Sequence, residues 1–369
     1  MTAARRAPLG AGEAAPWFHA PVLGGSDRYA FDTAAGRPVL MLFFGTAANP
    51  ASAAALAAVQ ARRALFDDVR AAFYGITVDP ADSQQRRIRP QLPGIRFFLD
   101  HDGAVSRAFG AVAEAGYLGH WLLLDRTLRV AARFALADGV AALDAFETLA
   151  RAPAPQDWAP AILVPDVLEP EMCRRLIGLY EADGGEESGF MRDEGGMTRL
   201  ILDPRHKVRR DYLVEDPELA RQLNLRIIQR LLPMVRRAFM FEATRVERLL
   251  VGCYEAETGG HFRPHRDNTS KGTAHRRFAV TINLNAEDYE GGDLRFPEYG
   301  DRTYRAPTGG AVVFSCALLH QAMPVAKGRR FAFLPFLYDE AGAKLREENA
   351  RFLEGELANY RASNDVVVE

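Results

Sequence analysis

The chain of 369 residues has little cysteine: only Cys173, Cys253 and Cys316, which lie far apart. An odd number of widely spaced cysteines gives no disulfide framework, so we expect a reducing, cytoplasmic location. Long apolar runs are also absent, and residues 1–20 lack the apolar core of a signal peptide. The sequence therefore predicts neither a membrane span nor a secretion signal.

An excess of either charge is missing as well. The chain has 46 Lys and Arg residues against 48 Asp and Glu residues, for a net charge of -2. This balance gives no electrostatic reason to expect binding to nucleic acid. What the chain has in quantity is apolar residues, at 48%. That content is ample for packed cores, and the length suggests two domains.

Residues 1–152 alternate apolar strands with helices. Strands are expected at 38–44, 72–78 and 96–100, helices at 51–66 and 140–150, and a hairpin at 117–134. This alternation predicts an α/β layer fold. Pro and Ala then alternate through a segment that disfavours helix, so residues 153–160 are expected to be a linker.

Residues 161–340 form the second predicted domain. It opens with an amphipathic helix at 169–180, followed by a loop at 182–196 and a long helix at 217–241, where Pro233 can introduce a kink. Short apolar strands with Gly and Pro punctuation fill residues 248–337, which predicts a sandwich or jelly roll. Residues 341–369 are expected to form a charged C-terminal helix, over 341–362, and a tail.

The candidate site of this domain is formed by His265, Asp267 and His320. Two imidazoles and one carboxylate on one face of a metal are diagnostic of iron(II) oxygenases, because they hold the ion and leave positions open. Residues i and i+2 of a strand point to the same side, so His265 and Asp267 can meet one metal. His320 arrives from a later segment. We therefore predict that these three side chains bind iron.

Arg330 supplies the second half of this prediction. It heads an apolar strand shortly after His320, where an unpaired buried charge would be costly. A planar guanidinium pairs bidentately with a carboxylate. Arg330 is therefore expected to bind the distal carboxylate of a diacid whose other end chelates the metal.

The motifs Gly259-Gly-His-Phe-Arg-Pro-His265-Arg-Asp267 and His320-Gln-Ala-Met-Pro-Val-Ala-Lys-Gly-Arg-Arg330 resemble those of the prolyl 4-hydroxylase-type 2-oxoglutarate/iron(II) dioxygenases. The resemblance covers residues 160 to 340. It implies a double-stranded β-helix (jelly roll) with supporting helices, and the use of Fe(2+), 2-oxoglutarate, O2 and often ascorbate. It also implies that Tyr254 and Thr281 line the cosubstrate pocket. Phe262 departs from the family, which commonly has Tyr there.

The N-terminal domain resembles the thioredoxin-like fold, in particular the peroxiredoxins. The cues are Gly12-Glu-Ala-Ala-Pro-Trp-Phe18, the apolar strand at 39–44 and Gly75-Ile-Thr-Val-Asp79. The peroxidatic cysteine is missing, because the turn after the first strand is Gly45-Thr-Ala-Ala-Asn-Pro-Ala-Ser52. Ser52 cannot cycle through sulfenic acid and disulfide. We expect a redox-inactive domain that serves for docking, for dimerisation into a homodimer, or for substrate delivery. Thr46 and Asn49 are expected to be turn residues.

The predicted function is a 2-oxoglutarate- and iron(II)-dependent dioxygenase that oxidises a C–H bond of a protein side chain or a small molecule. One alternative is a non-catalytic binding or sensor protein with an idle iron site. Another is a thiol peroxidase, which the missing cysteine opposes. Several other side chains are expected to have no role in the site: His206 and His275 at the surface, and Cys253 and Cys316 in the core. Arg199, Arg209 and Arg210 are expected in a solvated loop, with contact to an acidic group of the substrate as the alternative.

Overall fold

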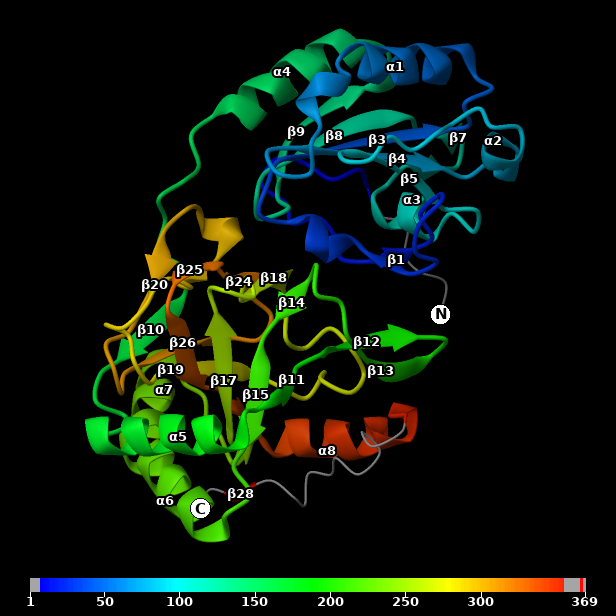
Figure 1. The fold of residues 1–369 in the computed structure, drawn as a ribbon. Coiled ribbons are helices and arrows are strands. Elements are labelled where there is room, and N and C mark those ends of the chain that lie inside the picture. Colours follow the sequence, from blue (N-terminus) through cyan, green and yellow to red (C-terminus); the bar gives the residue numbers. More distant parts are fainter. Residues whose placement is uncertain (1–6, 355–365, 368–369) are drawn as a thin grey trace. The chain divides into compact units, whose positions relative to one another are not determined.

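The computed structural model describes residues 7–354 and 366–367. The chain forms two compact units (Figure 1), the first comprising Met1–Gln156 with Pro297–Gly300 and the second the remainder. No helix of the described residues is long and apolar enough to cross a bilayer.

The first unit is built around one five-stranded sheet in the order β5-β4-β3-β8-β9. Strands β3, β4 and β5 are parallel, and β8 and β9 are antiparallel to their neighbours. The central strand β3 is apolar and buried on both faces, as its unbroken run of large side chains requires. The helices and strands of the first unit are β1 (His19–Ala20), β2 (Tyr29–Ala30), β3 (Val39–Gly45), α1 (Pro50–Ala61), β4 (Ala72–Thr77), α2 (Pro80–Gln84), β5 (Ile95–Leu99), α3 (Ala104–Ala108), β6 (Val112–Ala113), β7 (Gly116–Tyr117), β8 (His120–Leu124), β9 (Val130–Ala135) and α4 (Gly139–Arg151).

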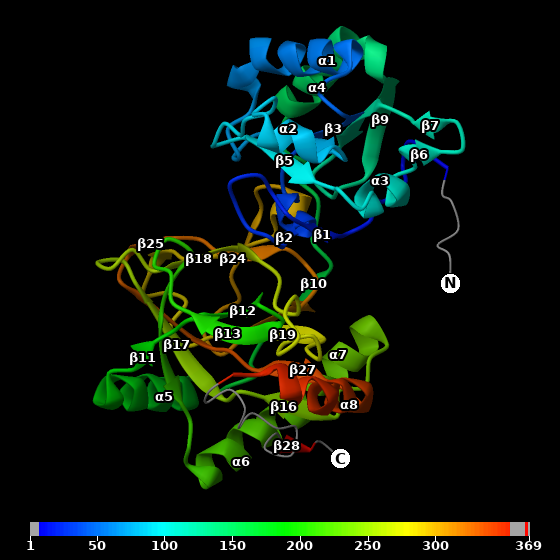
Figure 2. The ribbon, with the colours of Figure 1, turned by 90° about the vertical axis from the view of Figure 1, so that its right-hand side faces the viewer.

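Helices α1 and α4 lie side by side over one face of this sheet, as Figures 1 and 2 both show. Val59 of α1 and Phe146 of α4 join Leu40 and Leu42 of β3 in one buried cluster. The other face is covered by aromatic rings, among them Phe31 and Phe98, which meet edge to face. These two layers confirm the α/β fold predicted for this region.

Most described strands of the second unit lie in two antiparallel sheets, besides the two-stranded pairs β12–β13 and β20–β25. The larger has ten strands and contains the path β11-β15-β17-β26-β19-β27-β16-β28, and the smaller has the order β14-β18-β24-β21-β22. The strands are β10 (Ala161–Val164), β11 (Glu186–Glu187), β12 (Phe190–Glu194), β13 (Met197–Ile201), β14 (Lys207–Val208), β15 (Arg210–Leu213), β16 (Arg245–Glu247), β17 (Leu250–Glu255), β18 (His261–His265), β19 (Phe278–Asn283), β20 (Glu290–Gly291), β21 (Leu294–Arg295), β22 (Thr303–Tyr304), β23 (Ala311–Ser315), β24 (His320–Ala322), β25 (Val325–Lys327), β26 (Arg329–Phe333), β27 (Phe336–Tyr338) and β28 (Val366–Val367).

Helices cover the outer face of the larger sheet (Figure 1). They are α5 (Pro170–Asp183), α6 (Pro217–Arg226) and α7 (Leu232–Phe239), and α8 (Glu340–Asn349) follows β27. Leu176, Leu223 and Val235 from these helices pack against Ile282 and Phe333 of the sheet. Alternate residues of the same strands therefore point to the opposite, inner face.

Three predicted elements differ in the structure. Residues 190–201 form the hairpin β12–β13, where the acidic, Gly-rich sequence had predicted a loop over 182–196. The predicted strand 329–337 divides into β26 and β27 around Pro335, which has no N–H for the ladder. The α-helix predicted over 341–362 ends at Asn349, and Leu353 is extended; residues 355–362 lie outside the described part.

The long helix predicted over 217–241 is interrupted rather than simply kinked. A π-helical turn, Ile227–Leu231, joins α6 to α7 directly before Pro233. Proline cannot donate to the carbonyl four residues earlier, and a wider turn relieves that conflict. The apolar positions Leu219, Leu223, Ile227 and Leu231 nevertheless all remain buried.

Candidate iron and 2-oxoglutarate site

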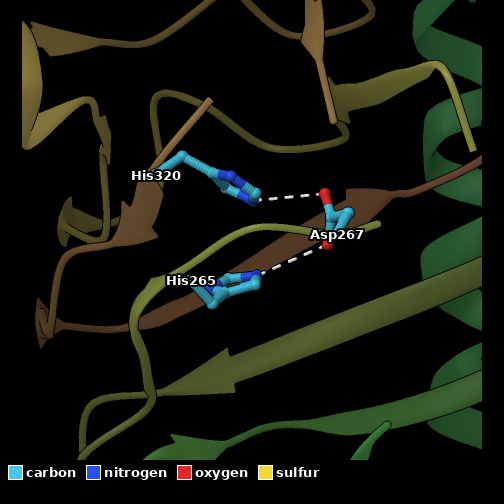
Figure 3. Close-up of side chains that lie close together, drawn as sticks. All are labelled: His265, Asp267 and His320. Atoms are coloured by element: carbon cyan, nitrogen blue, oxygen red, sulfur yellow. Dashed lines mark ion pairs between the residues drawn. The ribbon is translucent and has the colours of Figure 1, made fainter. Parts of the chain in front are cut away.

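The structure brings His265, Asp267 and His320 together (Figure 3). They lie at one end of the strand pair β18–β24 in the smaller sheet. His265 ends β18 and His320 begins β24, and the two are directly opposite each other across the strand pair. Asp267 lies two residues beyond β18, where its N–H donates to Cys316 O at 3.0 Å. Strand pairing therefore supplies the two imidazoles, and the turn after β18 supplies the carboxylate.

The distances within this cluster suit a single metal ion. Nε2 of His265 is 3.5 Å from Oδ1 of Asp267, and Nε2 of His320 is 3.3 Å from Oδ2. The three prospective ligand atoms all lie within 4.8 Å of one another. Adjacent ligands of a first-row metal lie about 3 Å apart when each bond is about 2.1 Å. The donor set is the two-histidine, one-carboxylate face predicted from the sequence.

Backbone carbonyls orient both imidazoles. Nδ1 of His265 lies 2.7 Å from Arg263 O, and Nδ1 of His320 lies 3.0 Å from Leu318 O. A carbonyl accepts, so Nδ1 carries the proton in each ring and Nε2 presents its lone pair to the metal position. The rings are also fixed by packing: Phe262 stacks on His265 at 3.5 Å between centroids, and Phe314 lies 4.6 Å from His320.

The protonation states match a metal site. Burial is the main cause that lowers the pKa of His265, to about 4, so its imidazole is neutral near pH 7. Burial alone would raise the pKa of Asp267, but His320 and His265 together hold it well below its ordinary value. A neutral imidazole and an ionised carboxylate are the forms that bind a cation.

Arg330 occupies the inner face of the larger sheet. Phe331 and Phe333, its neighbours on β26, belong to the core beneath the helices, so Arg330 points the opposite way. The residue is 4% exposed, and its Nε has no hydrogen-bond partner. Among the described residues no carboxylate pairs with its guanidinium. A buried charge left in this state fits an anionic ligand supplied from outside.

Tyr254 and Gly292 lie against the Arg330 side chain. Tyr254 is its cross-strand partner on β17, and the Arg330 guanidinium carbon lies 5.3 Å from the centre of the Tyr254 ring. Gly292 has φ +68°, and a Cβ there would come within 3.2 Å of Arg330 Cδ. Glycine at this position therefore permits both the turn and the close approach of the arginine side chain.

Tyr254 and Thr281 lie where the predicted pocket requires. Tyr254 is buried beside Arg330, and its hydroxyl is 3.3 Å from Nη1 of Arg209. Thr281 is buried on β19 between Val280 and Ile282, which face the helices, so Thr281 shares the inner face with Arg330. Within the described residues Thr281 makes no direct hydrogen bond to Arg330.

The polar residues around the site correct several predictions. Arg209 is not in a solvated loop: it is buried and pairs with both oxygens of Asp211, at 2.6 and 2.7 Å. His275 is not at the surface but 1% exposed, with Nε2 at 2.8 Å from Glu247 Oε2. His206 is half-buried, its ring 6.4 Å from that of His265.

Arg199 and Arg210 are exposed, as predicted, but they lie on strands β13 and β15 rather than in a loop. The three cysteines are all buried and free, and burial raises the pKa of Cys173 to about 11 and of Cys253 to about 12. These two thiols are therefore protonated near pH 7 and act as apolar core groups.

Sequence reasoning missed Lys207. This residue begins β14, opposite Phe262 on β18, and is 6% exposed. Nothing in the spacing of residues 207–214 marks this lysine. Only the pairing of β14 with β18 reveals that the side chain approaches the metal-binding residues.

The turn after β3 of the first unit, residues 45–52, contains no thiol. Ser52 is buried in the first turns of α1 and donates to Phe44 O at 2.7 Å. Asn49 is the N-cap of the same helix, accepting from Ala51 N at 2.9 Å, as expected of a turn residue. The sequence has no cysteine before Cys173, so this unit cannot supply the thiolate of a thiol peroxidase.

Comparison with known families agrees with both halves of this description. Residues 249–338 match the 2OG-Fe(II) oxygenase superfamily, and residues 11–133 match the AhpC/TSA family. The C-terminal unit is a 2OG-Fe(II) oxygenase domain. The N-terminal unit is an AhpC/TSA domain of peroxiredoxin-like fold. The expected family resemblance and the two fold classes are thereby confirmed.

Individual relatives are more distant. A PKHD-type hydroxylase of Synechococcus sp. (strain JA-2-3B'a(2-13)) is 31% identical over 93 residues, which are 24% of this chain and 41% of that protein, so less than half of its length is matched. The PKHD-type hydroxylase PiuC of Pseudomonas aeruginosa is 28% identical over 217 residues, 55% of this chain and 88% of the relative.

Similar solved structures exist for each unit of the chain. A viral collagen prolyl hydroxylase from Paramecium bursaria Chlorella virus-1 has 14% identity and a TM-score of 0.36, covering 49% of this chain and 96% of its own. The bacterioferritin comigratory protein of Xanthomonas campestris has 20% identity and a TM-score of 0.31, covering 37% and 92%.

Proposed function

We propose that this protein is a 2-oxoglutarate- and iron(II)-dependent dioxygenase of the prolyl 4-hydroxylase type. The single observation that supports this most strongly is the combination of the His265, Asp267 and His320 cluster with a buried guanidinium that has no carboxylate partner in the described chain. The first fits a ferrous ion, and the second fits the far end of a diacid.

In this proposal each group of the chain has a distinct task. His265, Asp267 and His320 hold iron(II), and Arg330 receives the distal carboxylate of 2-oxoglutarate. Iron(II), 2-oxoglutarate and O2 together supply the oxidative decarboxylation to succinate and CO2 that is coupled to oxidation of a substrate C–H bond. Tyr254 and Thr281 shape the pocket that orients the cosubstrate, and Phe314 and Phe262 exclude water from the imidazoles.

The substrate proposed for this chemistry is a prolyl or other side chain of a protein, or a small molecule, and ascorbate would maintain iron in its reduced state. The PKHD-type hydroxylases and the prolyl hydroxylases among the similar proteins motivate the prolyl class. We also propose that the catalytic domain spans residues 161–340 and that residues 153–160 form the linker.

The test is succinate formation by the full chain reconstituted with Fe(II) and supplied with 2-oxoglutarate and O2. We expect succinate in amounts that depend on both iron and 2-oxoglutarate. Iron binding is measured separately by metal analysis after desalting. A chain that binds no iron and forms no succinate would contradict the proposal.

A further inference from the structure

Lys207 projects into the same region as the metal-binding residues. Its Nζ lies 4.9 Å from the centre of the Phe262 ring, and that ring stacks on His265. Lys207 and Phe262 are direct partners in the β14–β18 pairing. The Phe262 ring therefore contacts both the amine of Lys207 and the imidazole of His265, a proposed iron ligand.

The chain gives Lys207 only neutral hydrogen-bond acceptors. Nζ lies 2.6 Å from Ser188 Oγ and 2.7 Å from Gly189 O. No carboxylate of the described residues lies within ion-pair distance of it. Burial removes the hydration of this 6% exposed amine and, together with Arg209, holds its pKa well below the ordinary value, so an anion beside it would stabilise the charged form.

The nearest carboxylate outside the proposed metal site is already committed. Asp211 accepts two hydrogen bonds from Arg209 and one from Ser188, and Arg248 approaches it at 3.6 Å. One carboxylate thus serves two arginines. Arg330 remains for 2-oxoglutarate. Neither assignment gives Lys207 a carboxylate partner.

The pattern extends from Arg330 toward the proposed iron position. Arg330 lies against Tyr254, Tyr254 accepts from Arg209, and Arg209 and Lys207 flank the same serine, Ser188. Gly252 allows Arg209 to lie across the strand, since a Cβ there would meet Arg209 Cδ at 3.0 Å. Lys207, Arg209 and Arg330 are therefore linked through Ser188 and Tyr254, with Arg209 already paired to Asp211.

We propose that the primary substrate of this enzyme carries a carboxylate and that Lys207 binds it beside the iron site. This inference rests on the proposed function and names the substrate class for that same site. A free amino acid or another small organic acid fits it, and Lys207 is then a specificity-determining residue. A neutral peptide segment would leave the ammonium without a counter-charge.

A purely structural role for Lys207 makes a different prediction. If the lysine only fastens Ser188 and Gly189 before β12, then Lys207→Met and Ser188→Ala should have similar effects on unfolding and on ligand affinity. If it binds an anion, Lys207→Met should lose acid binding, Lys207→Arg should recover most of it, and Ser188→Ala should retain it.

The experiment uses the full chain loaded with Fe(II) and 2-oxoglutarate without O2. Binding of the free amino acids and short 2-hydroxy acids is measured by titration calorimetry, each against its primary amide, which differs only in the carboxylate. Aerobic succinate formation with each compound is measured in parallel. We expect at least one acid to bind about 10- to 100-fold more tightly than its amide, and Lys207→Met to remove that preference.

The results separate the two proposals. Wild-type protein that binds iron and 2-oxoglutarate but prefers no acid in the panel over its amide overturns the inference and leaves the proposed function standing. Loss of affinity for 2-oxoglutarate in Lys207→Met, with acid binding intact, assigns the lysine to the cosubstrate and also overturns it. Failure of wild type to bind iron and 2-oxoglutarate counts against the proposed function itself.

Discussion

Buried polar groups near the turn after β3 in the first unit have partners within the protein. On the inner face of the second unit, two buried basic side chains have no carboxylate partner among the described residues. In the first, Asp82 is completely buried, yet it accepts from Ala47 N at 2.9 Å and from Thr77 Oγ1 at 2.6 Å. Ser52 is likewise bonded to the backbone. In the second, Arg330 and Lys207 are buried without a carboxylate partner in the described chain. Polar groups that the protein satisfies by itself stabilise a fold, whereas those left incomplete mark where a ligand belongs.

The largest effect should come from removing the carboxylate of the proposed metal site. We expect Asp267→Ala to abolish iron retention and succinate formation, because two imidazoles alone lose both a donor and the compensating charge. Metal analysis and a succinate assay measure the two effects. Glu290→Ala, at an exposed position, is the control and should resemble wild type. Normal turnover by Asp267→Ala would exclude this residue as a ligand.

A carboxylate whose partners are all protein groups gives the opposite kind of variant. Glu247 is 2% exposed and is bound by Arg276 at 2.7 Å and His275 at 2.8 Å. Glu247→Gln should lower the free energy of unfolding by about 3 to 5 kcal/mol, since it leaves Arg276 charged and unpaired. Urea denaturation of variant and wild type at pH 7 checks this value. An unchanged midpoint would show that the pair contributes nothing net.

The pH dependence of this difference has a definite sign. Burial alone would raise the pKa of Glu247, but Arg276 and His275 hold it well below its ordinary value. The folded state therefore remains ionised while the unfolded chain takes up a proton. The stability that Glu247 contributes is fully present above about pH 5 and is lost as pH falls further. The difference in the free energy of unfolding between wild type and Glu247→Gln should accordingly become smaller in acid.

Arg330 should behave differently from Glu247 because its proposed partner is absent from the chain. We expect Arg330→Met to raise the KM for 2-oxoglutarate by about 30- to 150-fold, the equivalent of about 2 to 3 kcal/mol for a charged hydrogen-bonded pair. In the absence of ligand the variant should unfold at the same or a higher urea concentration, because an uncompensated buried charge has been removed.

The adjacent residue provides a matched control for this substitution. Arg329 is exposed on the same strand and pairs with Glu181 at 2.6 Å. Arg329→Met should leave the KM for 2-oxoglutarate within about twofold of wild type, since exposed pairs contribute little. Equal effects at positions 329 and 330 would argue against a specific diacid anchor.

The smallest effect is expected in the first unit. Ser52→Ala removes one buried hydrogen bond to Phe44 O and should cost about 1 kcal/mol of stability, with succinate formation unchanged. Thermal unfolding and the succinate assay measure the two quantities. A large change in turnover would indicate that this turn acts on the oxygenase chemistry after all.

Much of the fold could be predicted from local patterns. The apolar run at 39–44 and the strand 311–315 carry their own signal, since buried strands consist of large apolar residues. The hairpin β12–β13 could not be predicted in the same way, because its sequence is polar and rich in glycine. Its pairing depends on contacts made elsewhere in the domain, such as the bonds from Lys271 N and Gly272 N to Asp193 and Thr198.

The sequence by itself determined the donor chemistry of this protein: two histidines, an aspartate and an arginine in a fixed order, and a peroxiredoxin-like domain without its thiol. Only the tertiary structure decided that Arg209 and His275 are buried and that Lys207 stands beside the proposed iron site. The physical reason is that charge balance in an interior depends on which residues distant in the chain become neighbours. Spacing along the sequence does not carry that information.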